Sequence, residues 1–427
     1  MQAKEWRDLA ERVAGGGLCL YVALFPFHHL FPWNVLVSRA GLIVAASAGL
    51  AACFLDRRSP VVPSPVTAIF GLFVTVSALS ALLGVDPLAS SHAVGKSLLR
   101  ATAVFLLAAG LSRAERWREE LATALSLSGV GLAAVGFALF FLGIQNAFGG
   151  VTVPGIDYNS ICMLLVPAAA FALRGASRAR RHRAWVLTGA AALVVAAVAL
   201  SYSRIGWAAF AILIATLWVS LPAARRHVAG TALAGVLAFA LLSPGLGSVA
   251  AITDNDRFLS NRDAELDSRY FTKLTWREVL TMNNRLEYAW KPAVRLIGRR
   301  PVLGAGYGEL TFDRLLHGEK VLWHEHNAVL SVAVQSGLVG VATYLALLAA
   351  VIVSTLRSLR RTGSGADRSL AAALLAAFVA EYLFQGLGEP TNNGRMGTLF
   401  ALLAGMSVGL AAREEEPSAD PAGPEAR

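Results

Sequence analysis

The sequence predicts an all-α polytopic membrane protein of about twelve transmembrane helices, with one large loop on the outer side of the membrane. Hydrophobic residues make up 56% of the 427 residues and charged residues only 15%, and the mean hydropathy is +0.56. This composition is too apolar for an ordinary soluble protein. Apolar stretches of about 20 residues, the length that a helix needs to cross about 30 Å of hydrocarbon, recur along the chain. Only helices suit such long runs without alternation.

The expected spans follow one another with short connections, except before the tenth. Each is a mostly apolar run bounded by charged residues, proline or glycine, which is the pattern of a membrane helix and its flanking turns. We expect them over residues 14–33, 36–55, 64–84, 97–112, 120–143, 159–174, 184–202, 205–221, 228–246, 329–356, 369–388 and 395–412.

Arginine residues cluster in alternate connections, and this alternation predicts the orientation. Connections rich in arginine and lysine stay on the cytoplasmic side of a membrane, so we expect both chain termini there. We then attribute the net charge of +10 to the basic cytoplasmic connections and to contact with anionic lipids. We expect no nucleic acid as a partner. The residues that set the orientation are Arg57, Arg58, Arg113, Arg116, Arg118, Arg174, Arg178, Arg180, Arg181, Arg183, Arg225, Arg226, Arg357, Arg360, Arg361 and Arg368.

The three cysteines, Cys19, Cys53 and Cys162, fall inside expected spans and lack metal-ligand spacing. They therefore predict neither a disulfide framework nor a zinc site. A basic segment precedes the first apolar run, as in a signal peptide, but that run has full length and no convincing cleavage site, so we interpret it as an uncleaved first helix.

The longest connection, residues 247–328, faces outward in this topology. The chain accordingly divides into spans one to nine (1–246), a periplasmic loop domain (247–328), spans ten to twelve (329–412) and a cytoplasmic tail (413–427). Connections longer than about 15 residues are usually functional or disordered. Apolar residues at helical spacing over 275–300 predict an amphipathic helix at the bilayer surface.

Proline and glycine punctuate the end of this loop helix. Pro292 is expected to kink or divide the helix and Pro301 to end it. Gly304, Gly306 and Gly308 then predict a flexible turn. Their GAGYGEL string superficially resembles a dinucleotide-binding loop, but no strand precedes it, and we give that interpretation almost no weight.

Several ionisable side chains converge on the outer ends of the spans, and most of them are cationic. Arginine suits a diphosphate because its planar fork donates paired hydrogen bonds and stays charged. A cationic outer cavity bordered by apolar helices thus favours an amphiphile with an anionic head, such as a polyprenyl diphosphate. The alternative is that helix-end arginines only reach lipid phosphates; Arg204, in a very short turn, fits that alternative least well. The cationic residues concerned are Arg39, Lys96, Arg100, Arg204, Arg285 and Arg395.

His324 and His326 stand directly before the tenth span. A histidine accepts and returns a proton near neutral pH, so one here is a candidate catalyst for a lipid-borne substrate. The simpler alternative is a solvated interface histidine, and a metal site is weakly supported without further ligands. Glu381 and Gln385 in span eleven are expected to hydrogen-bond neighbouring helices. Tyr307, like the loop tryptophans, is expected to be an ordinary interface aromatic rather than a sugar-stacking platform.

Four motifs carry a resemblance to a known family. They are Ser203-Arg204 between two spans, NRLEYAW at 284–290, RPVLGAGYG at 300–308, and HNAVLSVAVQSGLVG at 326–340, in which Gly337 and Gly340 follow the His-Asn pair. Their order and spacing resemble the O-antigen ligase and polymerase superfamily, over nearly the whole chain. Each motif alone is weak, and together they are fairly specific.

The resemblance implies a GT-C-like membrane glycosyltransferase of the bacterial inner membrane that needs no nucleotide sugar, no cofactor and no metal. Ligases of the family move a polysaccharide from undecaprenyl diphosphate onto the lipid A-core oligosaccharide at the periplasmic face, with inversion at the anomeric carbon. By the resemblance, His326 is the base that deprotonates the acceptor hydroxyl. Arg204 and Arg285 hold the diphosphate, with His324, Arg100, Lys96 and Asn327 as possible secondary residues.

Other functions stay open at this point. An O-antigen polymerase uses the same kind of donor, and a protein oligosaccharyltransferase of the superfamily is the next alternative. A lipid or glycan transporter is the alternative from a different class, but it predicts polar groups near the middle of the membrane and paired broken helices. Other loop arginines could replace Arg285 in the diphosphate role; they are Arg257, Arg262, Arg269, Arg277, Arg299 and Arg300.

Overall fold

In the part of the chain that the computed structural model describes, the regular elements are helices, and Val153 and Ile156 form an isolated bridge. The structure describes residues 3–28, 30, 32–56, 59–144, 150, 151, 153, 156, 158–242, 286–308, 325–362, 365–384, 386 and 394–415. The α-helices in this part of the chain are α1 (Ala3–Leu24), α2 (Pro32–Leu55), α3 (Pro65–Leu83), α4 (Pro87–Ala93), α5 (Leu99–Leu111), α6 (Glu115–Phe141), α7 (Tyr158–Arg178), α8 (Arg181–Leu200), α9 (Arg204–Ser220), α10 (Arg225–Leu242), α15 (Lys291–Arg299), α17 (Ala328–Arg361), α18 (Gly365–Ala377) and α19 (Gly394–Glu415).

Short π- and 3-10 segments join several of these helices. The π segments are η2 (Val94–Leu98), η4 (Leu286–Trp290) and η5 (Phe378–Phe384), and the 3-10 segments are η1 (Phe25–Phe27) and η3 (Pro222–Ala224). Each π segment runs directly into or out of an α-helix, so η2, η4 and η5 are local changes of helical pitch rather than separate elements.

Local sequence signals explain where several helices begin. Ser64 accepts a hydrogen bond from the Thr67 amide at 3.0 Å and precedes Pro65, the first residue of α3. Asp86 does the same for the Ala89 amide at 3.0 Å before Pro87 of α4. A polar N-cap followed by proline satisfies a free amide and presets the first helical turn.

The all-α membrane architecture predicted from the sequence is confirmed. Within the described residues, 10 helical stretches are long and apolar enough to cross a membrane. The two further predicted spans coincide with α9, which has 17 residues, and with α18 continued by η5, so the count of twelve stays a prediction. Helix α1 starts at Ala3, well before the predicted residue 14, because charged turns extend it beyond its apolar run.

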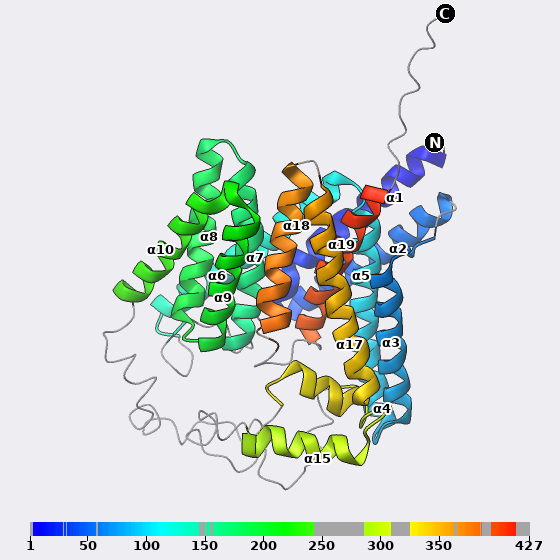
Figure 1. The fold of residues 1–427 in the computed structure, drawn as a ribbon. Coiled ribbons are helices and arrows are strands. Elements are labelled where there is room, and N and C mark those ends of the chain that lie inside the picture. The colour runs from blue at the N-terminus through cyan, green and yellow to red at the C-terminus, as the bar shows by residue number, and fades with distance from the viewer. Residues whose placement is uncertain are drawn as a thin grey trace, which may run out of the picture.

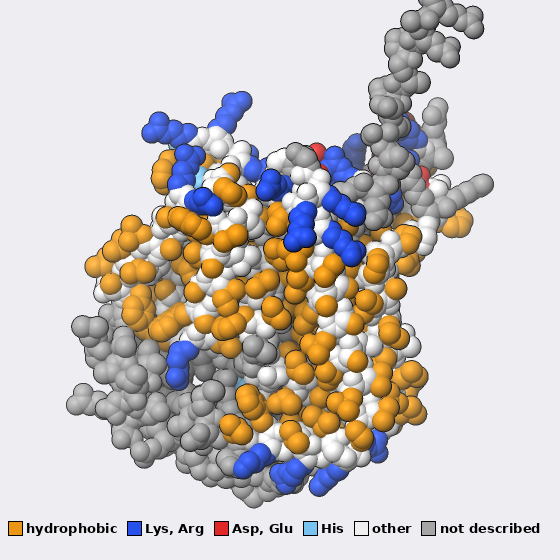
Figure 2. Space-filling model, in the orientation of Figure 1, with side chains coloured by type: hydrophobic (Ala, Val, Ile, Leu, Met, Phe, Trp, Pro, Cys, Tyr) orange, Lys and Arg blue, Asp and Glu red, His pale blue; other side chains and the backbone are white. Residues whose placement is uncertain are grey.

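The two ends of the helical assembly differ. Helix α1 begins and α19 ends at one end, here called the terminal end, whereas α4 and α15 lie at the opposite end, the α15 end (Figure 1). Lysine and arginine side chains gather at the terminal end, hydrophobic side chains form a broad band below it, and a smaller basic group lies near α15 (Figure 2). This distribution agrees with the predicted membrane orientation, which stays a prediction.

Small residues bring the helices of the core close together. Helices α7 and α19 are among the most buried spans, and α19 packs along α5. A Cβ atom at Gly405 would lie 2.5 Å from the Phe105 carbonyl oxygen, and one at Gly409 would lie 2.6 Å from that of Ala109. Glycine at these two positions lets the backbones meet, as is usual for packing between membrane helices.

Buried ion pairs fasten the terminal end. Arg118 of α6 is 1% exposed and donates hydrogen bonds to the Ser112 carbonyl and to Asp367 of α18, each at 2.9 Å. Arg413 of α19 reaches the second oxygen of Asp367 at 2.9 Å. One carboxylate therefore neutralises two arginines from two other helices, which gives these charges a structural role.

Candidate active site

Helix α17, which follows the His326-Asn327 pair directly, is broken at Gly337. That residue has φ 66° and ψ −169°, far from helical values. Residues 328–336 run across the α15 end, and the rest of α17 turns to run along the bundle (Figure 1). The predicted span over 329–356 falls within α17, which is long and apolar enough to cross a membrane, but the sequence did not predict the break at Gly337. A left-handed backbone at Gly337 redirects the chain, and glycine adopts this conformation without steric cost.

The turn at residues 301–308 fills the break in α17. A Cβ at Gly337 would lie 2.2 Å from the Val302 carbonyl oxygen, and a Cβ at Gly304 would lie 2.5 Å from that of Gln335. Backbone hydrogen bonds from the turn satisfy amides and carbonyls that the break in α17 would otherwise leave unpaired. They run from Ala305 N to Val334 O at 2.8 Å, from Gly306 N to Gln335 O at 3.0 Å, and from Leu338 N to Pro301 O at 2.7 Å.

The same turn is bound to the end of α3. The Val85 amide donates to the Ala305 carbonyl at 2.7 Å, and the Arg300 guanidinium donates to the Leu83 carbonyl at 3.0 Å. Ser80 donates to the Gln335 carbonyl from the other side of the break. The sequence predicts a flexible turn here, but the structure has a junction hydrogen-bonded on both sides. The glycines provide close backbone approach rather than a phosphate-binding loop.

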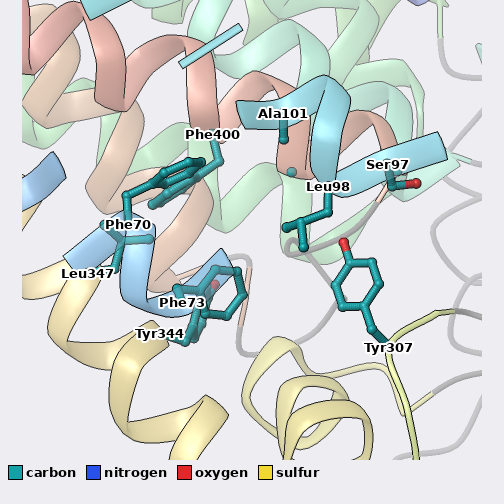
Figure 3. Close-up of a pocket in the computed structure, with 11 residues that line it drawn as sticks. Phe70, Phe73, Ser97, Leu98, Ala101, Tyr307, Tyr344, Leu347 and Phe400 are labelled. Carbon is teal, nitrogen blue, oxygen red and sulfur yellow. The ribbon is translucent and has the colours of Figure 1, made fainter. Parts of the chain in front are cut away.

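Tyr307 belongs to this junction and not to a sugar-binding surface. Its side chain is 3% exposed and points toward Leu98, between the turn, α3 and the start of α5 (Figure 3). The adjoining cavity, with Phe73 and Tyr344 on its wall, measures about 30 Å³. Sites for small molecules span about 300–1,000 Å³, so this cavity is too small for a glycan. The expectation that Tyr307 is an interface aromatic is also wrong, because the turn buries it in the core.

His326 lies two residues before α17 in a fixed loop. The Asn327 side chain caps the helix by accepting a hydrogen bond from the Leu330 amide at 3.0 Å. On the other side of His326, the Glu325 carbonyl accepts a hydrogen bond from the Trp290 indole at 3.1 Å. His326 itself is partly buried and has φ 48°. A left-handed backbone costs a non-glycine residue about 1 kcal/mol or more, and such strain is typical of functional sites.

Arg204 is the first residue of α9 and its side chain is exposed. The preceding Ser203 caps the helix by accepting a hydrogen bond from the Gly206 amide at 3.1 Å, and its hydroxyl donates to Asn159 of α7 at 2.6 Å. Tyr202, one residue earlier, is buried with φ 58°. The short turn predicted at 201–204 is therefore present. The positive charge of Arg204 adds to the positive end of the α9 helix dipole. Together they favour binding of an anion there.

Lys96 and Arg100, the secondary candidates for binding the diphosphate, differ in their surroundings. Lys96 lies exposed in η2. Arg100 of α5 donates hydrogen bonds to Thr398 at 3.2 Å and to the Gly394 carbonyl at 3.1 Å, both in the first turns of α19. Because its donors hold the start of α19, a structural role for Arg100 is better supported than diphosphate binding.

The structure brings some of the predicted site residues to one end. The starts of α9 and α17, and with them Arg204 and His326, lie at the α15 end (Figure 1). Arg285 and His324 lie outside the described residues, as do Gln385 and the loop arginines before 286. Arg285 directly precedes η4, and η4 is joined to the His326 loop through the hydrogen bond from Trp290 to Glu325.

Glu381 is a residue that sequence reasoning interpreted wrongly. It lies in η5, is 1% exposed, and neither carboxylate oxygen has a hydrogen-bond partner within the part of the chain that the structure describes. The expected bond to a neighbouring helix is therefore absent there. A π segment with a buried ionisable group is typical of functional positions in membranes, but no pattern in the sequence marks the π turn.

The family model described as O-antigen ligase (Wzy_C) matches residues 189–345. This match supports membership of the O-antigen ligase superfamily. The matched segment runs from within α8 to within α17 and contains Arg204, Arg285 and His326 together with Gly337. It leaves out Lys96 and Arg100. Among curated proteins, no match to this chain is found.

Proposed function

We propose that the protein is an O-antigen ligase, which transfers a polysaccharide from undecaprenyl diphosphate to the lipid A-core oligosaccharide. The observation that carries the proposal is the family match over 189–345, since that segment contains Arg204, Arg285 and His326. The reaction takes place at the α15 end, facing the periplasm of a bacterial inner membrane, with both termini in the cytoplasm.

In the proposed reaction, His326 accepts the proton of the acceptor hydroxyl. The acceptor oxygen forms a bond to the anomeric carbon of the donor sugar while the bond from that carbon to the diphosphate oxygen breaks. The undecaprenyl diphosphate leaves with the electron pair, and Arg204 and Arg285 stabilise its charge. A single displacement inverts the anomeric configuration.

The local structure supports this division of roles. The hydrogen bonds of Asn327 and Glu325 hold the backbone on either side of His326, and a base must be positioned before its proton affinity matters. Arg204 combines a guanidinium with the N-terminus of α9, and both groups attract a phosphate. Diphosphate is a good leaving group, so no carboxylic acid opposite the base is required.

The test is a reaction of the purified protein with lipid-linked glycan, with and without lipid A-core. We expect product only when lipid A-core is present, and a loss of about 10²–10⁴-fold in rate for His326→Ala, the usual contribution of a general base. His182→Ala is the matched control, because His182 is an exposed histidine of α8 at the terminal end; it should react as the unaltered protein.

Two results would contradict the proposal in different ways. Product that forms only by lengthening of the donor glycan would identify a polymerase instead. Undiminished transfer by a folded His326→Ala variant would remove His326 as the base while leaving the transfer reaction intact.

A further inference from the structure

Five arginines gather where α8 and α10 begin, at the terminal end and away from the candidate active site. Three lie over residues 180–183 and two over 225–226, and all five are exposed. The two helix starts pack against each other, because the Thr188 hydroxyl pairs with the buried His227 ring at 2.7 Å and Trp185 contacts that ring edge-on. These five arginines are called here the α8–α10 basic patch.

No carboxylate neutralises this patch within the part of the chain that the structure describes. The sequence contains no aspartate or glutamate between Asp157 and Asp254. None of the five arginines forms an ion pair with a described residue. The carboxylate of Glu119 on α6 is engaged by Arg174 and Arg178 of α7 instead. The α8–α10 basic patch is therefore cationic.

The two arginines of α10 are positioned by neutral groups and keep donors for a ligand. Arg225 donates through Nε to the Trp218 carbonyl at 3.0 Å, and its guanidinium lies 5.7 Å from the centre of the Trp218 ring. Arg226 donates through Nε to the His227 ring at 3.1 Å. In both residues the two terminal nitrogens form no hydrogen bond with a described residue, and such nitrogens bind phosphate oxygens.

Helix dipoles distinguish this patch from other arginines at the terminal end. Arg360 and Arg361 lie in the last turn of α17, where the negative end of the helix dipole offsets part of their charge. The α8–α10 basic patch lies at the positive ends of two helices of 20 and 18 residues. Because these dipoles add to the charge of the arginines, an anion is attracted more strongly here than at the end of α17.

Two tryptophans place the patch at the depth of lipid head groups. Trp185 and Trp218 are 57% and 44% exposed, and tryptophan gathers at the boundary between head groups and hydrocarbon. Figure 2 shows basic side chains of the terminal end directly above the hydrophobic band. One turn further along each helix, Gly189 and Gly230 are exposed, and a Cβ at either would meet nothing within 4 Å. This surface thus offers a lipid both a cationic site and room for a hydrocarbon chain.

We propose that the α8–α10 basic patch binds one phospholipid with two phosphates, of the cardiolipin type. One phosphate lies at the start of α8 and the other at the start of α10. Packed helices are about 8–10 Å apart, so two separate groups of arginines suit two phosphates joined by a glycerol better than one phosphate. Basic sites between membrane helices suit such head groups. The patch takes no part in the proposed transfer reaction, so either proposal can fail without the other.

The experiment measures lipid binding to the purified full-length protein by native mass spectrometry. Cardiolipin, phosphatidylglycerol and phosphatidylethanolamine with identical acyl chains serve as probes. We expect cardiolipin to bind about 10-fold more tightly than phosphatidylglycerol, which has one phosphate, and this factor corresponds to about 1.4 kcal/mol. Phosphatidylethanolamine, which has no net charge, should bind most weakly.

Charge variants test whether the patch is the site. Arg180→Gln with Arg183→Gln removes two charges at the start of α8, where neither side chain forms a hydrogen bond with a described residue, and should weaken cardiolipin binding about 10-fold. Arg360→Gln with Arg361→Gln is the matched control, because it removes the same charge from exposed positions at the end of α17. The control should bind cardiolipin as the unaltered protein does.

Arg225→Gln tests the start of α10 separately and should also weaken cardiolipin binding about 10-fold. If one variant fails to fold, the other decides. Equal binding of cardiolipin and phosphatidylglycerol by the unaltered protein would overturn the proposal. The same holds for unchanged cardiolipin binding in a folded patch variant, or for a control variant that weakens binding as much as the patch variants do.

Discussion

His326 and Arg204, the two candidate active-site residues, lie at the starts of two helices that begin in the same way. His326 and Tyr202 both have a left-handed backbone, and each is followed by a polar N-cap, Asn327 or Ser203. A chain that enters a helix through such a residue is bent sharply, and the cap hydrogen bond fixes the bend. Neighbouring residues thereby determine the orientation of the side chain at each bend. That side chain is His326 at the start of α17 and Arg204 at the start of α9.

Replacement of Asn327 separates capping from substrate contact. Asn327→Ala removes the hydrogen bond to the Leu330 amide and should cost about 1 kcal/mol in stability, with slower transfer because the His326 loop loses its anchor. Asn327→Ser keeps a cap and should retain most activity. Thermal unfolding and transfer rates check this. A stable Asn327→Ser variant as inactive as Asn327→Ala would instead assign the side chain to substrate binding.

Replacement of Arg204 tests the proposed contact with the diphosphate. A charge-assisted hydrogen bond contributes about 1.5–3 kcal/mol, so Arg204→Ala should lower kcat/KM by about 10–100-fold, and Arg204→Lys should lie in between. Unfolding should change little, because the side chain is exposed. The control is Arg181→Ala, which alters the exposed first residue of α8 at the terminal end. Equal kinetics for the two alanine variants would count against the role of Arg204.

At the scale of the element, α17 is two helices that share one junction. The segment 328–336 and the helix after Gly337 are joined by the 301–308 turn, whose backbone completes the hydrogen bonds of both. A membrane helix tolerates a break only where other groups satisfy the freed amides and carbonyls. The glycine-rich turn at 301–308 therefore helps to position the His326 loop indirectly, because it fixes the backbone at the break in α17.

A methyl group at Gly337 should disrupt this junction. A Cβ there would lie 2.2 Å from the Val302 carbonyl oxygen, and φ is 66°, so Gly337→Ala strains the backbone and forces the turn away. We expect a large loss of folded protein in detergent extracts, measured by size-exclusion yield and melting temperature. Gly298→Ala in α15, where a Cβ meets nothing within 4 Å, should be neutral or slightly stabilising. Equal yields of the two variants would contradict the close approach at the junction.

At the scale of the whole molecule, charge divides the protein into two ends. At the terminal end, buried carboxylates such as Asp367 pair with arginines of several helices. At the α15 end, Arg204 stands exposed at a helix start. Because a buried charge is stable only when it is paired, the first end fits a structural role and the second fits binding of an anionic substrate.

Removal of the Asp367 charge should destabilise the assembly of α6, α18 and α19. Asp367→Asn leaves Arg118 buried without its carboxylate partner, and breaking a buried pair costs about 3–5 kcal/mol. Glu120→Gln, which alters an exposed pair with Arg116 one helical turn away, should cost no more than about 0.5 kcal/mol. Melting temperatures of the two variants check the difference. A similar melting temperature for both would show that the Asp367 network contributes little.

Much of the fold and part of the site follow from local sequence. The arginine of the Ser203-Arg204 turn could be predicted because a cap and a helix start need only a few consecutive residues. The role of Arg100 could not, because its partners in α19 lie 294 and 298 residues away in sequence. The same limit explains Glu381, whose burial depends on the helices packed around η5.

The sequence by itself determined the all-α membrane class and His326 and Arg204 as candidates, and it predicts which end of the bundle faces outward, since hydropathy, charge bias and short motifs are local properties. Only the tertiary structure decided that α17 breaks at Gly337, that the glycine-rich turn closes the break, and that Tyr307 is buried. The physical reason is that each of these depends on contacts between segments that are distant in the sequence. The Ser80 hydrogen bond to the Gln335 carbonyl, which joins residues 255 apart in sequence, is one of them.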